Sequence, residues 1–311
     1  MKFITFENKI VNKVQIQAIM KVAILIAVHK YPIQVKRLIE AFQSDQFTFF
    51  IHVDKKADIS PFRKLITGEN IIFINNRTKV EWAGFSQVEA TQTCMKEIVA
   101  FDNFDYITFI SGQDFPIKKP AYFQNFLIQN PNKEFVSCVP FDLGNEWWRR
   151  NKNRVLKFNF NNWKIPGKYK IQFLFNCLKA ERKPPKPYVI SGNSNWFCVS
   201  MKCARYIIEK IDQEKALLDF FKYVWGADEM VIPTILYNSP FKGNLTSPIV
   251  YVEWSKINDG HPETLKIKDL DKILSSEKIF ARKFDMAVDN EVISYLEKHL
   301  INNKLDSISV K

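Results

Sequence analysis

Apolar runs rich in β-branched and aromatic residues alternate with helix-type patterns through the first half of the chain. Runs of this kind predict buried strands. The predicted strands lie near residues 22–28, 47–53, 71–75, 106–110 and 134–140, and the predicted helices near 32–43, 60–67, 86–100 and 120–129. This alternation predicts an α/β fold with a mostly parallel central sheet flanked by helices.

The second half of the chain has a less regular pattern. It predicts a strand pair near 188–199, a strand at 249–253 and helices near 202–211, 213–222, 228–237, 269–275 and 289–300. In the first half, Ser86 and Glu89 have the spacing of a capping box at the start of the helix at 86–100. The nine glycines never fall as GxGxxG and no Walker loop is present, which argues against a dinucleotide-binding or P-loop motif.

Polar residues follow the ends of three predicted strands. His29 follows the first strand, Asp54 the second and Asp114 the fourth. Because ligands of open α/β sheets bind outside the carboxyl ends of the strands, these residues form a candidate site. Taken alone, Asp114 is equally well explained by an Asx turn that accepts hydrogen bonds from local amides, and His29 by a satisfied core histidine.

The composition limits the class of protein. The chain has 311 residues, 46% hydrophobic and 14% aromatic, which is enough for a large core in one elaborated domain at 20–311. Residues 1–19 are either an appended helix or an over-long start. The five cysteines are odd in number and lie mostly in apolar runs, which favours reduced core thiols and a reducing compartment. No Cys/His cluster has the spacing of a zinc site.

Charge is distributed unevenly along the chain. The net charge is +12, and between Arg149 and Lys186 twelve Lys or Arg residues and one acid, Glu181, give +11. We expect a basic lobe or insertion at about 145–187. It could contact an anionic membrane leaflet, nucleic acid or an anionic acceptor, or be only a solvated face. The Pro-broken segment at 179–187 favours membrane contact. No segment has the ~18 to 20 apolar residues of a membrane-spanning helix.

Further motifs complete a set that runs along most of the chain. They are Glu81-Trp-Ala-Gly-Phe-Ser86, Ser191-Gly-Asn-Ser-Asn-Trp-Phe197, Asp228-Glu229 and Phe280-Ala-Arg-Lys-Phe-Asp285. Together with the strand ends, they give a chain that resembles the core-2/I-branching β-1,6-N-acetylglucosaminyltransferases and the related peptide O-xylosyltransferases. The resemblance is weakest between Asn151 and Pro187. It implies a GT-A-like nucleotide-sugar-binding fold and a UDP-sugar donor.

The resemblance also implies roles for individual residues. Glu229 matches the general base of the family, although an acid in the first turn of a helix would occupy the same place. Arg282 and Lys283 match the diphosphate-binding region, where core-2 enzymes use a basic side chain matching Lys283 instead of a metal; surface charge is the alternative. The other donor-binding candidates are Ala27, Val28, His29, Asp54, Lys55, Lys56, Trp82 and Asp114, and the acceptor-binding candidates are Glu146, Arg149, Arg150 and Trp254.

The sequence therefore predicts an inverting glycosyltransferase that acts on a carbohydrate hydroxyl, with a surface polysaccharide as the expected kind of acceptor. UDP-N-acetylglucosamine is the first choice of donor and UDP-xylose the second. Asp269-Leu-Asp271 is better explained by helix capping than by metal binding, so no metal or other cofactor is expected. We expect a cytoplasmic location, including peripheral contact with the inner face of the membrane. A non-catalytic sugar-binding relative is one alternative. A nucleic-acid-binding protein is another, but it leaves the strand-end motifs unexplained.

Overall fold

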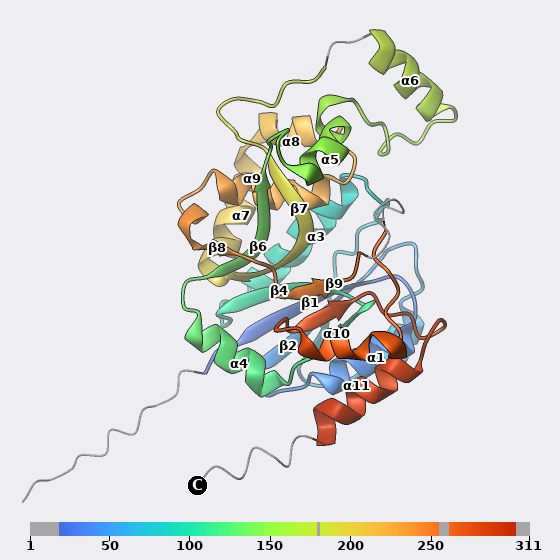
Figure 1. Ribbon diagram of the computed structural model, residues 1–311, viewed down its shortest axis with the longest axis vertical. Coiled ribbons are helices and arrows are strands. Elements are labelled where there is room, and N and C mark those ends of the chain that lie inside the picture. Colours follow the sequence, from blue (N-terminus) through green and yellow to red (C-terminus); the bar gives the residue numbers. More distant parts are fainter. Residues whose placement is uncertain (1–18, 179–180, 255–260, 303–311) are drawn as a thin grey trace, which may run out of the picture.

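A seven-stranded sheet forms the centre of the computed structural model, which describes residues 19–178, 181–254 and 261–302 (Figure 1). Its strand order is β3-β2-β1-β4-β7-β6-β8. The strands are β1 (Val22–Val28), β2 (Phe47–Val53), β3 (Ile71–Phe73), β4 (Tyr106–Ser111), β6 (Glu134–Pro140), β7 (Ser191–Ser200) and β8 (Leu245–Thr246). Strands β3, β2, β1 and β4 are parallel, and β7 is antiparallel to both of its neighbours. The predicted α/β fold with a mostly parallel central sheet is confirmed.

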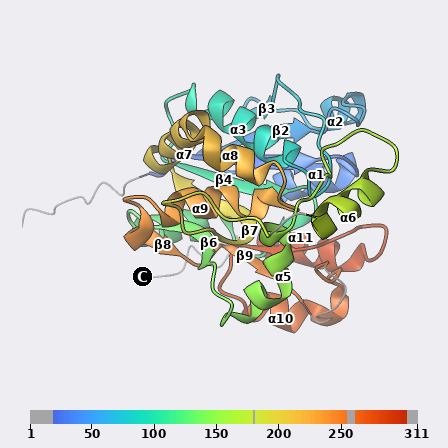
Figure 2. The same cartoon turned by 90° about the horizontal axis from the view of Figure 1, so that it is seen from above.

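Helices cover both faces of this sheet. In the view of Figure 2, α3 and α7 lie on one side of it and α10 and α11 on the other. The helices are α1 (Pro32–Ala41), α2 (Ser60–Leu65), α3 (Ser86–Val99), α4 (Pro120–Gln129), α5 (Glu146–Leu156), α6 (Lys168–Leu178), α7 (Met201–Gln213), α8 (Lys215–Phe221), α9 (Val231–Tyr237), α10 (Leu270–Ser275) and α11 (Glu291–Asn302). Three 3-10 turns complete the set: η1 (Ala227–Glu229), η2 (Lys242–Asn244) and η3 (Ile267–Asp269).

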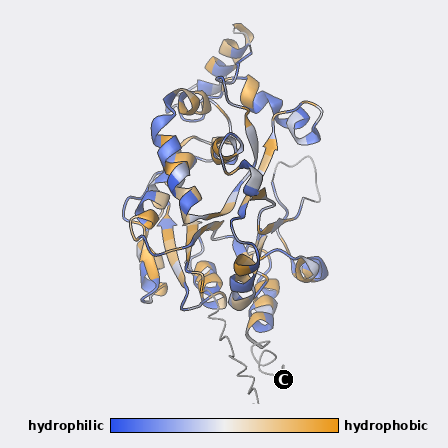
Figure 3. Cartoon of the chain, turned by 90° about the vertical axis from the view of Figure 1, so that its left-hand side faces the viewer, coloured by the Kyte–Doolittle hydropathy of each residue, from blue (hydrophilic) through white to orange (hydrophobic). Residues whose placement is uncertain are grey.

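The apolar runs of the sequence form the core. In β1, Val22 to Ile26 are completely buried, because a parallel strand in the middle of a sheet is covered on both faces. The central strands therefore have mainly hydrophobic colours in Figure 3. Each fully buried aliphatic or aromatic side chain contributes about 1.5–3 kcal/mol to folding.

A second, three-stranded sheet lies beside the first. It consists of β5 (Asp114–Pro116), β10 (Phe280–Arg282) and β9 (Val250–Val252), in the order β5-β10-β9. The central strand, β10, is antiparallel to β5 and parallel to β9. The sequence pattern predicted β9, but it predicted neither β5 nor β10, since three-residue strands are too short to show a period.

Two local predictions were wrong. The strand pair expected near 188–199 is the single strand β7, which is paired on both sides. The capping box at Ser86 and Glu89 does not form, because Ser86 is already helical and its Oγ accepts a hydrogen bond from the Glu81 amide at 2.8 Å. Asp269 makes no side-chain capping bond to α10, but its carboxylate accepts from the Lys266 amide at 2.9 Å and so caps the start of the 3-10 turn η3.

The helices α5 and α6 and their connecting loops occupy 145–187, where the sequence predicts a basic lobe. Helix α6 projects from the body of the molecule (Figure 1). The segment preceding Ile19 in the predicted extension lies outside the described residues, as do 179–180 of the basic stretch. In the described part of the chain, no helix is both long enough and apolar enough to cross a bilayer.

Candidate functional site

The carboxyl ends of three parallel strands meet at one edge of the central sheet. Ala27 near the end of β1 is level with His52 of β2 on one side and with Ser111 of β4 on the other. After β1 the chain continues outwards to β2 and β3, whereas β4 adds on the opposite side of β1. This reversal is the topological switch point where open α/β sheets bind ligands.

Asp54 lies at this edge, in a turn that is fixed by its own backbone and side chain. Its amide donates to the Val28 carbonyl at 2.8 Å, and its Oδ1 accepts from the Lys56 amide at 2.8 Å. Lys55 is exposed, and Lys56 forms an exposed ion pair with Glu81 at 3.6 Å. The carboxylate of Asp54 therefore keeps an oxygen for a further donor.

His29 follows β1 at the same edge. Desolvation of the ring, ahead of the positive charge of Lys30, lowers its pKa, so the imidazole is neutral at pH 7. A neutral imidazole has one donor and one acceptor nitrogen. The charges of Asp54 and Lys56 also act on the ring, which places all three side chains in one neighbourhood.

Arg77 holds the turn after β2. The sequence did not single this residue out. Its guanidinium donates to the backbone carbonyls of Val53 and Asp54 at 2.8 Å each and of Ala57 at 2.6 Å. The Asp54 carbonyl also accepts from the Ala57 amide at 2.8 Å, and together these bonds fix the turn that carries the Asp54 side chain. An isolated arginine in a loop carries no sequence signal for such a role.

Trp82 is 62% exposed and lies beside the turn that carries Glu229. Its ring meets the edge of Trp225 at a centroid distance of 5.1 Å and lies 5.5 Å from the His261 ring. The Gly226 amide donates to the Ala83 carbonyl at 2.9 Å, which ties the two loops together. An exposed indole at this place can cover a sugar or a base ring.

The small sheet brings Asp114 against Arg282. These two residues pair across β5 and β10, and Asp114 Oδ1 lies 3.5 Å from Arg282 Nε. The other carboxylate oxygen accepts from the amide and the hydroxyl of Ser111. The guanidinium also lies over the Trp196 ring, 4.1 Å from its centroid.

Asp114 has no exposed surface, so its carboxylate faces Arg282 and Ser111 rather than solvent. This corrects the predicted direct contact with a donor: in the structure Asp114 neutralises and positions Arg282. The Asx-turn alternative accounts for its bonds to Ser111. A fully buried carboxylate is stable only when it is paired in this way.

Lys283 follows Arg282 at the end of β10, and no ion pair joins it to a described residue. Burial lowers its pKa, and the positive charges of Arg282 and Lys30 lower it further. Three cations thus lie close together, which favours an anionic ligand, while the carboxylates of Asp285 and Glu263 act on the pKa of Lys283 in the opposite direction. Two of these three cations have a carboxylate partner, since Lys30 pairs with Asp285 at 3.2 Å and Arg282 with Asp114 at 3.5 Å.

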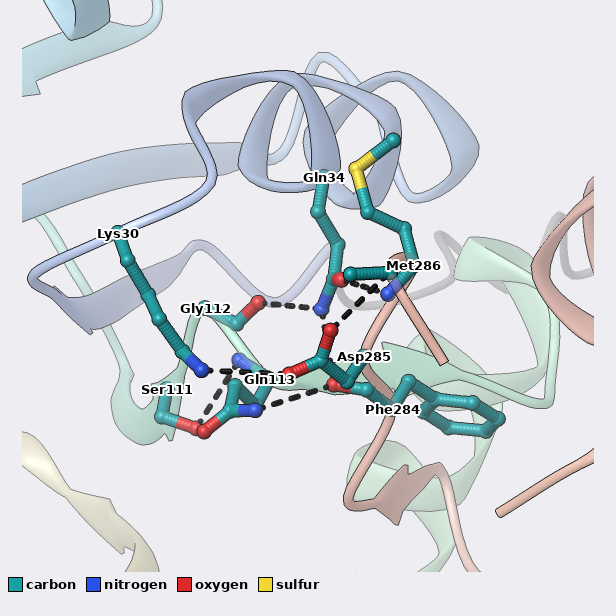
Figure 4. Close-up of polar contacts among 9 residues, drawn as sticks. Lys30, Gln34, Ser111, Gly112, Gln113, Phe284, Asp285 and Met286 are labelled. Atoms are coloured by element: carbon teal, nitrogen blue, oxygen red, sulfur yellow. Dashed lines mark hydrogen bonds and ion pairs between the residues drawn. The ribbon is translucent and has the colours of Figure 1, made fainter. Parts of the chain in front are cut away.

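Gln34 of α1 locks the segment that carries Lys283 onto the main sheet (Figure 4). Its buried amide nitrogen donates to the carbonyls of Gly112 at 2.9 Å and Phe284 at 3.1 Å, and its oxygen accepts from the Met286 amide at 2.9 Å. The backbone adds a bond from the Phe284 amide to the Gln113 carbonyl at 2.8 Å. Nothing in the sequence marks Gln34 for this role, because a glutamine in an amphipathic helix is normally solvated.

Glu229 ends the 3-10 turn η1, and an arginine from α5 holds its carboxylate. Arg154 Nη2 lies 2.7 Å from Glu229 Oε2, and the same guanidinium donates to the carbonyls of Trp225 and Gly226 at 2.9 and 3.1 Å. It also lies over the Trp225 ring at 4.8 Å. About a third of the Glu229 side chain remains exposed, so one carboxylate can be oriented and still reach a ligand.

Gly226 makes this contact possible. Its φ of 65° is in the left-handed region, and a Cβ added to it would lie 2.3 Å from Arg154 Nη2. Both the backbone conformation and the space thus require glycine. The sequence showed the glycine, but not the arginine that approaches it.

Asp228, next to Glu229 in η1, accepts from Asn195 Nδ2 at 3.0 Å. Burial, and then the negative charge of Glu229, raise the pKa of Asp228 to about 7. The carboxylates of Asp114 and Glu229 also act on Arg282, where they oppose the lowering of its pKa by burial. The charge of Glu229 therefore interacts with that of Arg282. Arg282 and Lys283, at the end of β10, are called the cationic wall below.

The acceptor-side candidates are spread over two elements. In α5, Glu146 and Arg150 form an exposed ion pair with each other, and Arg149 is exposed on another face. The face that meets the Glu229 turn carries Trp147, Asn151 and Arg154 instead, spaced i, i+4 and i+7. The predicted α5 residues thus flank the site, and their neighbours enter it.

Trp254 is 55% exposed and follows β9. Since Val252 of β9 is level with Arg282 of β10 in a parallel pair, Trp254 and Lys283 leave the same edge of the small sheet. Within the described ranges, no three His, Cys, Asp or Glu side chains come together as a group that could hold a metal ion.

Comparison with known proteins identifies the family to which this chain belongs. The family model described as "Branch: Core-2/I-Branching enzyme" matches residues 22–276, which include the sheet, α5 and the Glu229 turn. The chain belongs to the core-2/I-branching enzyme family. The match also covers Trp254, whereas Arg282 and Lys283 lie just beyond it.

Individual relatives of this core-2/I-branching member come from two groups. The chain is 25% identical to mouse xylosyltransferase 2 and 24% identical to the Drosophila melanogaster xylosyltransferase oxt, over 90% and 86% of its own length. It spans about a third of those proteins, 34% and 32%. It is also 24% identical to the human β-1,3-galactosyl-O-glycosyl-glycoprotein β-1,6-N-acetylglucosaminyltransferase, over 92% of this chain and 71% of the relative.

Proposed function

We propose that the chain is a glycosyltransferase that moves a sugar from a UDP-sugar to a hydroxyl of a carbohydrate acceptor. One observation carries the proposal: Arg154 orients a single, partly exposed carboxylate, Glu229, next to a cationic wall at the ligand-binding edge of an α/β sheet. The names of the relatives, all transferases of sugars, support the same class.

In the proposed reaction the acceptor hydroxyl attacks the anomeric carbon of the donor sugar. Glu229 takes the proton of that hydroxyl, the new glycosidic bond forms, and the bond to the diphosphate breaks so that UDP leaves with its electron pair. A single displacement inverts the anomeric centre and needs only one base. The exposed ring of Trp82, and that of Trp254 on the acceptor side, would bound the sugars.

For the nucleotide we propose the turns after β1 and β2. The Asp54 carboxylate can accept from the uracil N3–H or from ribose hydroxyls, and the neutral His29 ring can donate or accept. Ala27 and Val28 bring the backbone of β1 to the same edge. Lys55 and Lys56 add positive charge around this turn.

We assign the leaving diphosphate to Lys283 rather than to Arg282. The charge of Arg282 is already balanced by Asp114, whereas Lys283 has no such partner among the described residues. Lys283 would then stabilise the negative charge that develops on the diphosphate, in the place of a divalent metal. Metal-independent transfer is part of this proposal.

N-acetylglucosamine is our first choice of sugar. Xylose is the second, and the names of the mouse and Drosophila relatives favour it. The two donors differ by a hydroxymethyl and an N-acetyl group, so the size of the sugar pocket decides between them. The polysaccharide acceptor and the cytoplasmic location remain predictions.

Calorimetric titration with UDP, UDP-N-acetylglucosamine and UDP-xylose in excess EDTA tests the proposal. We expect UDP to bind and one of the two sugars to be preferred. Binding that returns only with manganese or magnesium would contradict the assignment to Lys283. A chain that binds none of the three under either condition is not a UDP-sugar transferase.

A further inference from the structure

Helix α6 is attached to the protein by its polar side chains. Gln172 Oε1 accepts from the Phe160 amide at 2.8 Å. Asn176 accepts from the Phe158 amide at 2.9 Å and donates to the Phe158 carbonyl at 2.8 Å. Lys168 Nζ donates to the Asn161 carbonyl at 2.9 Å. The face of α6 that meets the body of the protein therefore carries polar side chains, which bond to the backbone of residues 158–161. Phe175 adds an aromatic contact on this face.

The opposite face of α6 is apolar and lies in solvent. Phe173 is 73% exposed, Leu174 59% and Leu178 75%, and no side chain of the helix is buried. Hydrophobic colour accordingly covers much of the helix at the top of Figure 3. A helix on the surface of a globular protein normally has the reverse arrangement, with its apolar stripe facing the core.

The lobe beneath α6 is well anchored. The guanidinium of Arg182, on the return path from the helix, is buried and donates to the carbonyls of Tyr223 at 3.0 Å and Phe220. It also lies over the Phe220 ring at 4.1 Å. The apolar face of α6 is thus presented on a support that is bonded to the body of the molecule.

Positive charge surrounds this apolar face. Lys170 lies on the outer side of α6 itself, and Lys164, Lys183 and Lys186 are exposed in the segments that lead to and from it. The whole stretch from 149 to 186 contains one acidic residue, Glu181. A basic fringe around exposed Phe and Leu is the pattern of helices that lie in the headgroup region of anionic membranes.

We propose that α6 docks on an anionic membrane surface, with Phe173, Leu174 and Leu178 entering the acyl boundary and the surrounding lysines contacting lipid headgroups. With 11 residues the helix is about 16 Å long, too short to cross the ~30 Å hydrocarbon core, so it lies in the interface. A second copy of the chain is the poorer occupant, because it would bring two basic lobes together.

Vesicle flotation tests this docking. The probes are phosphatidylcholine vesicles with and without phosphatidylglycerol, and the test variant is the triple substitution Phe173→Gln/Leu174→Gln/Leu178→Gln. We expect the wild-type chain to float with the anionic vesicles, and the triple variant to bind them at least about tenfold more weakly. The matched control, Ile33→Gln/Val288→Gln, removes exposed apolar side chains elsewhere and should bind as the wild type does.

A second readout covers the case in which the triple variant misfolds. Cys177 is the exposed cysteine of the chain and lies on α6, so it can carry an environment-sensitive fluorophore. We expect the emission to shift to the blue with anionic vesicles and not with neutral ones. The docking would be overturned by no shift, by equal flotation of the triple variant, or by a wild-type dimer in vesicle-free sedimentation that the triple substitution dissociates. An oligonucleotide that binds the lobe while anionic vesicles do not would also overturn it.

Discussion

The two halves of the candidate site are built in different ways. The half assigned to the nucleotide consists of strand ends, where the Asp54 amide bonds to the Val28 carbonyl and Asp54 Oδ1 bonds to an amide two residues later. The half that carries the proposed base depends on a side chain from another element, since Arg154 and Glu229 are 75 residues apart. Backbone bonds and the Arg77 guanidinium position the first half, whereas a side chain from the distant helix α5 positions the second.

This difference predicts how each half responds to substitution. Changes at strand ends should alter ligand affinity and leave the backbone in place. Changes in the second half should alter the rate of transfer or the stability of the fold, because each removed side chain leaves buried partners without their bonds.

The largest effect on transfer is expected for Glu229→Gln. The amide can still accept the hydrogen bond from Arg154, but it cannot take a proton, so kcat should fall by about 10²–10⁴-fold with the affinity for UDP unchanged. Calorimetry with UDP and a transfer assay separate the two quantities. Turnover at the wild-type rate would remove Glu229 from the mechanism.

Arg282→Met should act on stability. It leaves the Asp114 carboxylate buried without its cation, which costs about 3–5 kcal/mol in the free energy of unfolding. Urea denaturation measures this loss, and Lys283→Met, one residue further on, is the matched control that should change stability little. Equal losses in the two variants would contradict the different roles assigned to these neighbours.

Arg154→Met should lower kcat by about 10–100-fold and leave the affinity for UDP unchanged, because a base held in the wrong place no longer reaches the acceptor hydroxyl. Arg154→Lys keeps the charge and should restore part of the rate. If kcat does not change while the protein unfolds more easily, Arg154 has only a structural role.

Lys283→Ala should weaken UDP binding by about tenfold, the effect of losing one charge-assisted hydrogen bond in a partly exposed site. Titration with UDP measures it. Lys133→Ala, at an exposed lysine outside the site, is the control for net charge. Unchanged affinity in the Lys283 variant would place the diphosphate elsewhere.

A pH dependence of stability, rather than of rate or affinity, is expected from Asp228. Its pKa is raised from 3.8 to about 7 in the folded protein, so the folded state holds this proton more tightly than the unfolded chain does. The resulting stability is present at acid pH and is lost as the pH rises through 7. In Asp228→Asn this part of the fall should disappear, while the contributions of Asp114 and Glu134 remain. Denaturation curves across this pH range compare the two proteins, and identical slopes would contradict the shift.

The residues that the sequence singled out differ in how well their positions could be predicted. His29 and Asp54 follow β1 and β2 at one edge of the central sheet, and Trp82 lies beside the turn that carries Glu229, while their roles in binding and catalysis stay predictions. Asp114 follows β4 as predicted, but its side chain is completely buried instead of being open to a donor. In α5, Trp147, Asn151 and Arg154 meet the Glu229 turn and the Glu146–Arg150 pair flanks it, and the acceptor-binding role of that pair stays a prediction.

By itself the sequence determined the longer strands, most of the helices, the polar residues that end the strands and the basic stretch, since each of these depends on the period or composition of a few neighbouring residues. Only the tertiary structure decided the small sheet that pairs Asp114 with Arg282, the bond from Gln34 to a carbonyl 250 residues away, and the inverted faces of α6. These features depend on which buried polar groups meet across the fold, and a hydrogen bond between distant residues leaves no period in the chain.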